Sequence, residues 1–156
     1  MLTVKIYCKP YVAHYFLVKF GAGKSFVEMP ESNGLKEAFH GVLTTEYYPS
    51  DNLNLKGFST AIEVKVTDHE ITKFGHTINT KNFYAFNKIA EWYIKTEMCS
   101  MICLYRQSGL SWKQSIRAYQ NSMGYTDEVF DWKTIERSYE RWLIKIKSNS
   151  SINVGK

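Results

Sequence analysis

The sequence has little cysteine, no long apolar run and no arginine in its first two-thirds. Its three cysteines are an odd number for a disulfide framework, and Cys99 and Cys103 are interpreted as small buried hydrophobes. No stretch reaches the roughly 18 consecutive apolar residues of a membrane span. Lys5, Pro10 and Lys19 interrupt the region where a signal peptide would need its apolar core. These absences predict a cytoplasmic protein with reduced thiols and no membrane partner.

The sequence also lacks a catalytic or metal-binding motif. The segment 21–25 ends in Gly-Lys-Ser, as phosphate-binding loops do, but Val18 stands where such a loop needs its first glycine. A turn is therefore expected there. Four histidines are scattered, and the loosely spaced pair of His69 and His76 lacks the close ligand spacing of zinc sites. We expect no resident metal and no cofactor.

Acidic residues gather at Asp127, Glu128 and Asp131. Carboxylates in such a group can bind Mg²⁺ in a nuclease, but they also complement the positive end of a helix dipole. No arrangement of serine, histidine and aspartate typical of a hydrolase stands out. The sequence accordingly predicts a non-enzymatic protein without a small-molecule substrate, and a metal-dependent nuclease is the third-ranked alternative.

An aromatic-rich composition and an uneven charge distribution are the positive features. Aromatic residues make up 15% of the 156 residues, and most must form core because they bury the largest apolar area. Residues 1–80 hold eight lysines and eight acids, whereas residues 81–156 hold twelve lysines or arginines and seven acids, which gives the net charge of +5. All four arginines lie in the last third. This skew indicates either an anionic partner for the C-terminal part or an ordinary solvated basic surface.

Apolar patterning predicts mixed secondary structure in the first half of the chain. Alternating apolar and polar residues indicate strands at 2–8 and 61–66, and a shorter one at 25–29. Proline at the start and glycine after the end predict a helix over 10–20, although the aromatic run also fits a strand. Residues 48–59 have the composition of a loop. Ser32 is expected to cap a helix whose apolar face contains Leu35, Phe39, Val42 and Leu43.

The remainder is predicted to be helical. Thr67 or Asp68 caps a short helix ending at Gly75, and Asn79 or Thr80 begins a long helix to about Gln107. Its expected inward stripe is Phe83, Phe86, Ile89, Ala90, Tyr93, Ile94, Met98, Met101, Ile102 and Tyr105. Ser111 and Gln114 form a capping box for a helix that stops at Gly124 and buries Trp112, Ile116 and Tyr119. Asp131 caps a last helix with Trp132, Ile135, Tyr139, Trp142, Leu143 and Ile146 inside.

These elements predict an α+β, mainly helical protein. A small N-terminal sheet with helices would pack on a C-terminal helical bundle ending in a helix-turn-helix-like pair. The expected division is an N-terminal subregion over 1–60, a strand plus helical bundle over 61–147, and a disordered tail over 148–156.

The last two predicted helices follow the order of a helix-turn-helix. On the second, Lys133, Arg137, Arg141 and Lys145 recur every fourth residue, which makes a slowly winding basic stripe away from the apolar side. Such a stripe can lie along a groove of duplex DNA, and Lys113 and Arg117 would help on phosphates. Against this, the connector 124–131 is longer than in the simplest motif, and acids interrupt the basic side. An amphipathic helix with ordinary intrahelical ion pairs explains the same pattern.

Residues 61–97 offer a second possible nucleic-acid element. A strand, a short helix and a longer helix follow in the order of ribbon-helix-helix repressors, which dimerise through the strand and place its outer residues in the major groove. Here these would be Glu63, Lys65 and Thr67, and the acidic Glu63 fits poorly.

Residues 108–147 resemble the helix-turn-helix segments of small regulatory proteins of phages and mobile elements. The resemblance covers about a quarter of the chain and depends on Gly109 and Ser111, the turn at Gly124 and Tyr125, and the helix over 135–142. It implies a DNA-binding, transcription-regulating role and a possible homo-oligomer. The alternative is a protein-interaction or assembly module, such as a phage accessory factor, with surplus aromatics in an interface: Tyr47, Tyr48 and Tyr125.

Overall fold

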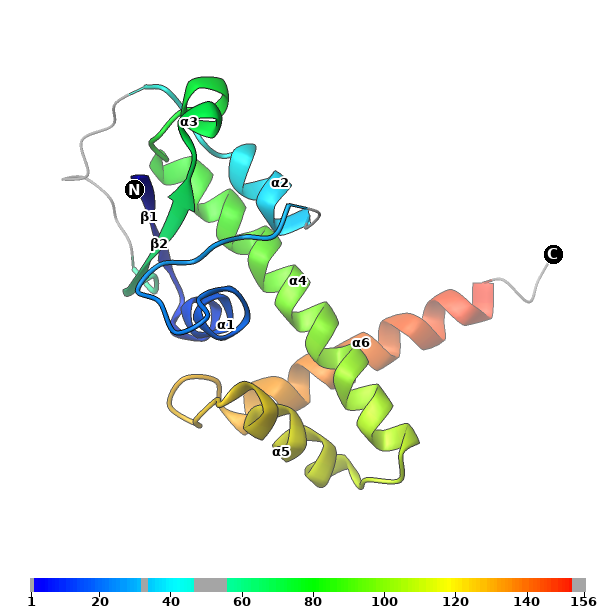
Figure 1. Cartoon of the computed structure of the whole chain (residues 1–156). Helices are drawn as coiled ribbons and strands as arrows, with labels where there is room; N and C mark the ends of the chain where they lie inside the picture. The colour runs from blue at the N-terminus through cyan, green and yellow to red at the C-terminus, as the bar shows by residue number, and fades with distance from the viewer. Residues whose placement is uncertain (1, 32–33, 47–55, 153–156) are drawn as a thin grey trace. The chain divides into compact units, whose positions relative to one another are not determined.

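The computed structural model describes residues 2–31, 34–46 and 56–152, with side chains as far as Asn149. The protein is α+β and 61% helical, with six helices and a two-stranded sheet in the described part of the chain (Figure 1). The residues form two compact units, an N-terminal unit (Met1–Tyr93) and a C-terminal unit (Ile94–Lys156). No helix in the described residues is long and apolar enough to cross a membrane.

The sheet joins two strands that lie far apart in the sequence. Strand β1 (Leu2–Cys8) pairs antiparallel with β2 (Thr60–Val66), from Leu2 opposite Val66 to Cys8 opposite Thr60 (Figure 1). Both predicted strands are confirmed. Alternate residues of each strand are buried on one face of the sheet, as a half-buried strand requires: Val4, Ile6, Cys8, Ile62, Val64 and Val66.

The division predicted at residue 60 does not match this pairing. All seven residues of β1 have partners in β2, so the strand pair crosses the predicted boundary, whereas the two units divide inside a helix. The loop predicted over 48–59 falls mostly on residues 47–55, which lie outside the described residues.

The strand predicted over 25–29 is reduced to a single bridge. The Val27 amide donates to the Glu63 carbonyl at 2.8 Å, and the Lys65 amide donates to the Val27 carbonyl at 2.9 Å. The next amide, that of Glu28, donates instead to Phe20 at 3.1 Å. This bond joins the segment to Phe20 on the side away from β2.

Three short helices complete the N-terminal unit. Helix α1 (Pro10–Phe20) begins with proline and ends before Gly21, as predicted. Helix α2 (Gly34–His40) is followed by a turn, and the predicted apolar residues of both segments are buried: Leu35, Phe39, Val42 and Leu43. The expected cap, Ser32, lies outside the described residues. Helix α3 (Asp68–Phe74) starts at a capping box of Thr67 and Glu70.

Gly75 ends α3 in a conformation that requires glycine. Its φ is 102°, a region that side chains with a Cβ rarely adopt. An added Cβ would also lie 2.2 Å from the carbonyl carbon of Thr44. The Thr44 carbonyl accepts from the amides of His76 and Thr77 there, so the chain after α3 is bound directly to the chain after α2.

Helix α4 (Thr80–Gln107) extends through the boundary between the units. The Asn79 side-chain oxygen accepts from the Asn82 amide at 2.9 Å, which confirms the predicted start. Six of the predicted inward residues are buried: Phe83, Phe86, Ala90, Ile94, Met98 and Ile102. Ile89 is the error in that prediction, since its side chain is 42% exposed. It is turned about 100° from Ala90 and falls outside the buried stripe.

The C-terminal unit contains the end of α4, helix α5 (Trp112–Met123) and helix α6 (Trp132–Ile152). The capping box of Ser111 and Gln114 opens α5, and Gly124 closes it in the left-handed region, both as predicted. Ile116 and Tyr119 are buried and Trp112 is half-buried, while Ile135 and Tyr139 are the buried residues of α6.

Two predictions for the end of α6 are wrong. Ser148–Ile152, expected to be disordered, continue the helix, because adding residues to an existing helix costs far less than nucleating one. The Ser148 hydroxyl donates to the Lys145 carbonyl at 2.9 Å within this extension. Ile146, predicted on the inner side, is 42% exposed, and every described residue from Ile144 to Asn149 is exposed.

Candidate nucleic-acid interface

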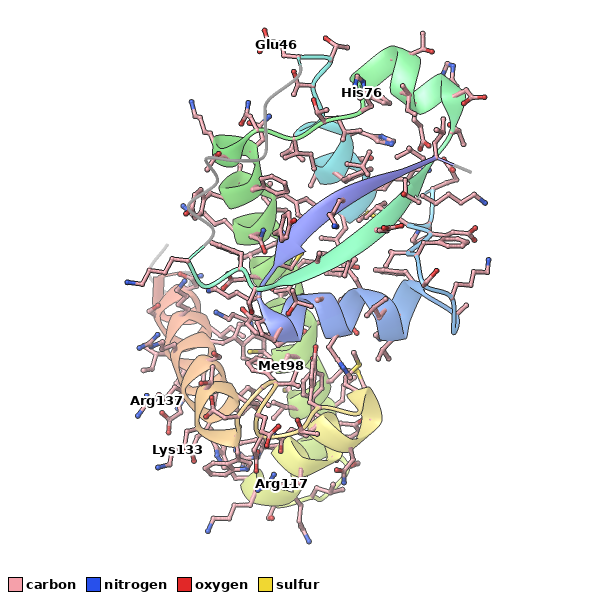
Figure 2. All side chains as sticks on the ribbon, turned by 90° about the vertical axis from the view of Figure 1, so that its left-hand side faces the viewer. Glu46, His76, Met98, Arg117, Lys133 and Arg137 are labelled. Atoms are coloured by element: carbon pink, nitrogen blue, oxygen red, sulfur yellow. The ribbon has the colours of Figure 1, made fainter. Side chains whose placement is uncertain are left out.

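The four predicted DNA-contacting residues of α6 lie on one exposed helix face. Lys133, Arg137, Arg141 and Lys145, called the basic face below, are all exposed, and no ion pair to them occurs within the described ranges. Figure 2 shows Lys133 and Arg137 following one another on the outer side of α6. The predicted alternative, a basic side neutralised by intrahelical ion pairs, does not apply to these four side chains.

Helix geometry separates the basic face from both the core and most of the acidic charge. Each step of four residues turns about 40°, so the face winds slowly: Lys133 lies about 160° around the axis from Ile135, and Lys145 only about 80° from it. Viewed down the axis, Glu140 lies about 60° from Arg137 and about 140° from Lys145. Acidic side chains therefore flank only the beginning of the basic face, and its later half has no acidic neighbour on the helix.

Asp131 is engaged at the start of α6 and confirms its predicted role as a cap. The Thr134 amide donates to its carboxylate at 3.0 Å, and the Thr134 hydroxyl donates to the other oxygen. The Thr134 hydrogen bonds lower the pKa of Asp131, and the charge of Arg137 lowers it further. The described residues contain no group of three acidic, histidine or cysteine side chains that could hold a metal ion.

The eight-residue connector between α5 and α6 is held by a buried amide. Gln120 donates from Nε2 to the Asp127 carboxylate and to the Phe130 carbonyl, each at 3.0 Å. Its own side-chain oxygen accepts from Arg117 at 2.8 Å. Tyr125 and Phe130 are buried in the same segment, edge to face at 5.3 Å. The connector is longer than a minimal turn, and the side chains of Tyr125, Asp127 and Phe130 make contacts within it.

Lys113 and Arg117, which were expected to contact phosphates, differ in their surroundings. Lys113 is exposed in the first turn of α5. Arg117 forms an ion pair with Asp127 at 3.2 Å while its side chain remains 55% exposed (Figure 2). The Gln120 hydrogen bond lowers the pKa of Asp127, and Arg117 adds to this effect. Arg117 thus supports the connector, and only Lys113 of this pair resembles the basic face in being exposed without an ion pair among the described residues.

An aromatic stack of three rings, not predicted as a unit, lies in the same part of the molecule. The ring centroids of Trp112 and Tyr139 are 4.9 Å apart, and the two rings are tilted by 54°. The ring centroids of Tyr139 and Trp142 are 5.8 Å apart, and these rings stack with an interplanar angle of 20°. The Arg106 guanidinium lies 5.1 Å from the Trp112 ring. The three-residue spacing of Tyr139 and Trp142 indicates that contact in advance. Contacts between α4, α5 and α6 have no sequence signature.

The second predicted element, around β2, is not available in the way a ribbon-helix-helix requires. One edge of β2 pairs with β1, and the other is bridged to Val27. Lys65 forms an ion pair with Glu28 at 2.7 Å, and Glu63 accepts from the Thr3 hydroxyl at 3.2 Å. With both edges occupied, β2 has no free edge for pairing with a second chain, so this prediction is wrong.

In a polar cluster of the N-terminal unit, Thr67 and Glu70 have the spacing of a capping box, but the contacts of Glu70 with Lys36 and His40 had no sequence signature. The Glu70 carboxylate accepts from the Thr67 amide at 2.7 Å, from Lys36 at 2.9 Å and from His40 at 3.0 Å. The His40 ring stacks on Phe74 at 4.3 Å. Burial alone would raise the pKa of Glu70, but these hydrogen bonds lower it to about 2. The cluster joins α2 to α3.

Comparisons of the chain with protein-family models, with curated proteins and with solved structures found no match.

Proposed function

We propose that the protein binds DNA through the basic face of α6 and that this binding serves a regulatory role. The observation that carries the proposal is the exposure of four cationic side chains along one helix face, without ion pairs in the part of the chain that is described. Phosphates attract such a row because binding releases the counterions condensed on DNA. The resemblance of residues 108–147 to helix-turn-helix segments points in the same direction.

Duplex DNA is the proposed ligand because a straight cationic helix face matches a groove bordered by phosphates. Arginine forks can hydrogen-bond guanine edges in the major groove, whereas lysines serve as phosphate contacts. Arg137 and Arg141 occupy the middle of the basic face, and Lys133 and Lys145 its two ends. On duplex DNA of arbitrary sequence the proposal assigns phosphate contacts to all four side chains, and at a specific site it assigns base contacts to the two arginines.

The test compares two double substitutions that remove the same charge. Arg137→Gln with Arg141→Gln removes the centre of the basic face, while Lys81→Gln with Lys88→Gln removes two exposed cations of α4 in the N-terminal unit. Losing two phosphate-type contacts should weaken duplex binding roughly 10- to 60-fold at about 0.1 M salt. The α4 variant should bind like the unmodified protein. Equal weakening by both variants in a fluorescence anisotropy titration would contradict the proposal, because it would indicate net charge alone.

A second candidate function is protein interaction or assembly. Leu104 and Ile144 in the C-terminal unit are 57% and 66% exposed, and large exposed apolar side chains favour an interface. Tyr125, an expected interface residue, is buried, and Tyr47 and Tyr48 lie outside the described residues. Light scattering after size exclusion distinguishes the two functions. A stable oligomer that ignores DNA at low salt favours assembly.

A further inference from the structure

The aromatic stack ends at Trp142, and the environment of this ring differs from that of the other two. Trp112 contacts both Arg106 and Tyr139, and Tyr139 contacts both tryptophans. Trp142 contacts no ring except Tyr139 in the described ranges, and its indole is half-buried. Tyr139 is buried and anchors the stack in the unit. The indole is therefore held in place and still reaches solvent.

Trp142 also borders the basic face. Lys145 follows it by three residues, so their Cβ atoms lie about 5–6 Å apart on the same side of α6. Arg141 precedes it directly and is exposed. One helix turn thus presents a flat aromatic ring beside Lys145, with Arg141 about 100° around the helix axis. A nucleotide has the complementary pair of groups, a flat base attached to a phosphodiester.

We propose that Trp142 stacks on an unpaired nucleobase, so that the preferred ligand is duplex DNA containing a single-stranded position. This inference rests on the proposed function, because the basic face must first hold the phosphates. Within an intact duplex both faces of each base are covered by neighbouring bases, and a side chain cannot stack on them without opening the helix. An unpaired base exposes its faces, and stacking on an aromatic side chain contributes about 1–3 kcal/mol per base.

The held position of the indole favours such a contact energetically. A ring already fixed by Tyr139 loses little rotamer freedom when a base arrives, and preorganisation of this kind strengthens binding. The stacking increment corresponds to roughly 5- to 150-fold in affinity. The protein should therefore distinguish a closed duplex from the same duplex with one unpaired base by a factor in this range.

The experiment measures affinity for these two probes, with a fluorescent adenine analogue at the unpaired position as a direct reporter of stacking. The unmodified protein should bind the probe with the unpaired base at least 5-fold more tightly and quench the analogue. Trp142→Leu should remove both effects while closed-duplex affinity stays unchanged. Trp142→Phe, which keeps a ring, should retain part of each. The matched control is Trp92→Leu, an exposed tryptophan of the N-terminal unit, which should change neither.

The possible results separate this inference from the proposed function. If closed and unpaired probes bind equally well, or if Trp142→Leu weakens both equally, the stacking inference is overturned and DNA binding by the basic face stands. If neither probe binds, both fail. Should Trp142→Leu lose its helical circular dichroism, the Trp142→Phe variant and the analogue fluorescence with the unmodified protein decide the question. Absence of quenching on binding then overturns the inference.

Discussion

Replacing Glu70 with glutamine removes one negative charge from the cluster between α2 and α3 while leaving a side chain that can still complete the capping box. The Thr67 amide keeps an acceptor, but Lys36 loses the carboxylate at 2.9 Å and retains only the exposed Glu31. Glu70→Ala also removes the acceptor of the Thr67 amide, which is the N3 half of the capping box, while the residue-70 amide can still donate to the Thr67 hydroxyl. The pair of variants therefore separates the contribution of the charge from that of the cap.

The magnitude follows from the pKa of Glu70. A shift from the ordinary 4.5 to about 2 corresponds to at most about 3 kcal/mol of stability above pH 4.5. Solvent reaches this cluster and screens the charges, which reduces the expected loss for Glu70→Gln to about 1–2 kcal/mol at pH 7. Glu70→Ala should cost about 1 kcal/mol more, because the Thr67 amide then loses its hydrogen-bond acceptor.

The lowered pKa of Glu70 also determines how its contribution to stability changes with pH. Because the folded protein holds Glu70 at the lower pKa, its contribution is complete above pH 4.5 and is lost as the pH falls toward about 2. Urea unfolding followed by NMR signals of β1 and β2 amides reports on the N-terminal unit. The difference between the unmodified protein and Glu70→Gln should shrink across this interval. A difference that is the same at pH 7 and at pH 2 would refute the reasoning.

Two further stability predictions concern the other parts of the fold. Gln120→Leu should lower the unfolding free energy of the C-terminal unit by about 1–3 kcal/mol, because the Phe130 carbonyl loses its hydrogen-bond donor. Tryptophan fluorescence in urea measures this loss. An unchanged unfolding midpoint would show that the connector does not depend on the Gln120 amide. Phe86→Ala should cost about 3–5 kcal/mol since the ring is fully buried, while Ile89→Ala, three residues later but 42% exposed, should cost well under about 1.5 kcal/mol. Similar losses for both in chemical denaturation would contradict the observed orientation of α4.

Local signals made most of the elements predictable. Several local signals each act within a few residues, so the sequence specifies them directly: proline at the start of α1, the capping boxes at Thr67 and Ser111, and glycine after α3 and α5. The alternation in β1 and β2 identified both strands. Their pairing with each other depends on contacts nearly sixty residues apart, which no local pattern encodes, and the predicted boundary at residue 60 consequently divided one sheet.

For the candidate site, the sequence showed the spacing of the cationic residues but not their exposure or their contacts. The four-residue recurrence of Lys133, Arg137, Arg141 and Lys145 was visible in the sequence, but their exposure was not, because it depends on which side of α6 meets the core. The contact of Arg117 with Asp127 joins α5 to the connector, and the stack around Tyr139 joins α5 to α6, so neither follows from a local pattern. The continuation of α6 beyond Lys147 was missed because serine and asparagine predict a disordered tail from composition alone.

The salt dependence of duplex binding tests the central claim most directly. If all four cations of the basic face contact phosphates, the logarithm of the association constant should fall against the logarithm of salt concentration with a slope of about −3.6. Arg137→Gln with Arg141→Gln should reduce the slope to about half of that value, and the Lys81/Lys88 variant should leave it unchanged. A slope near zero for the unmodified protein, or the same slope after loss of both arginines, would contradict DNA binding by this helix face.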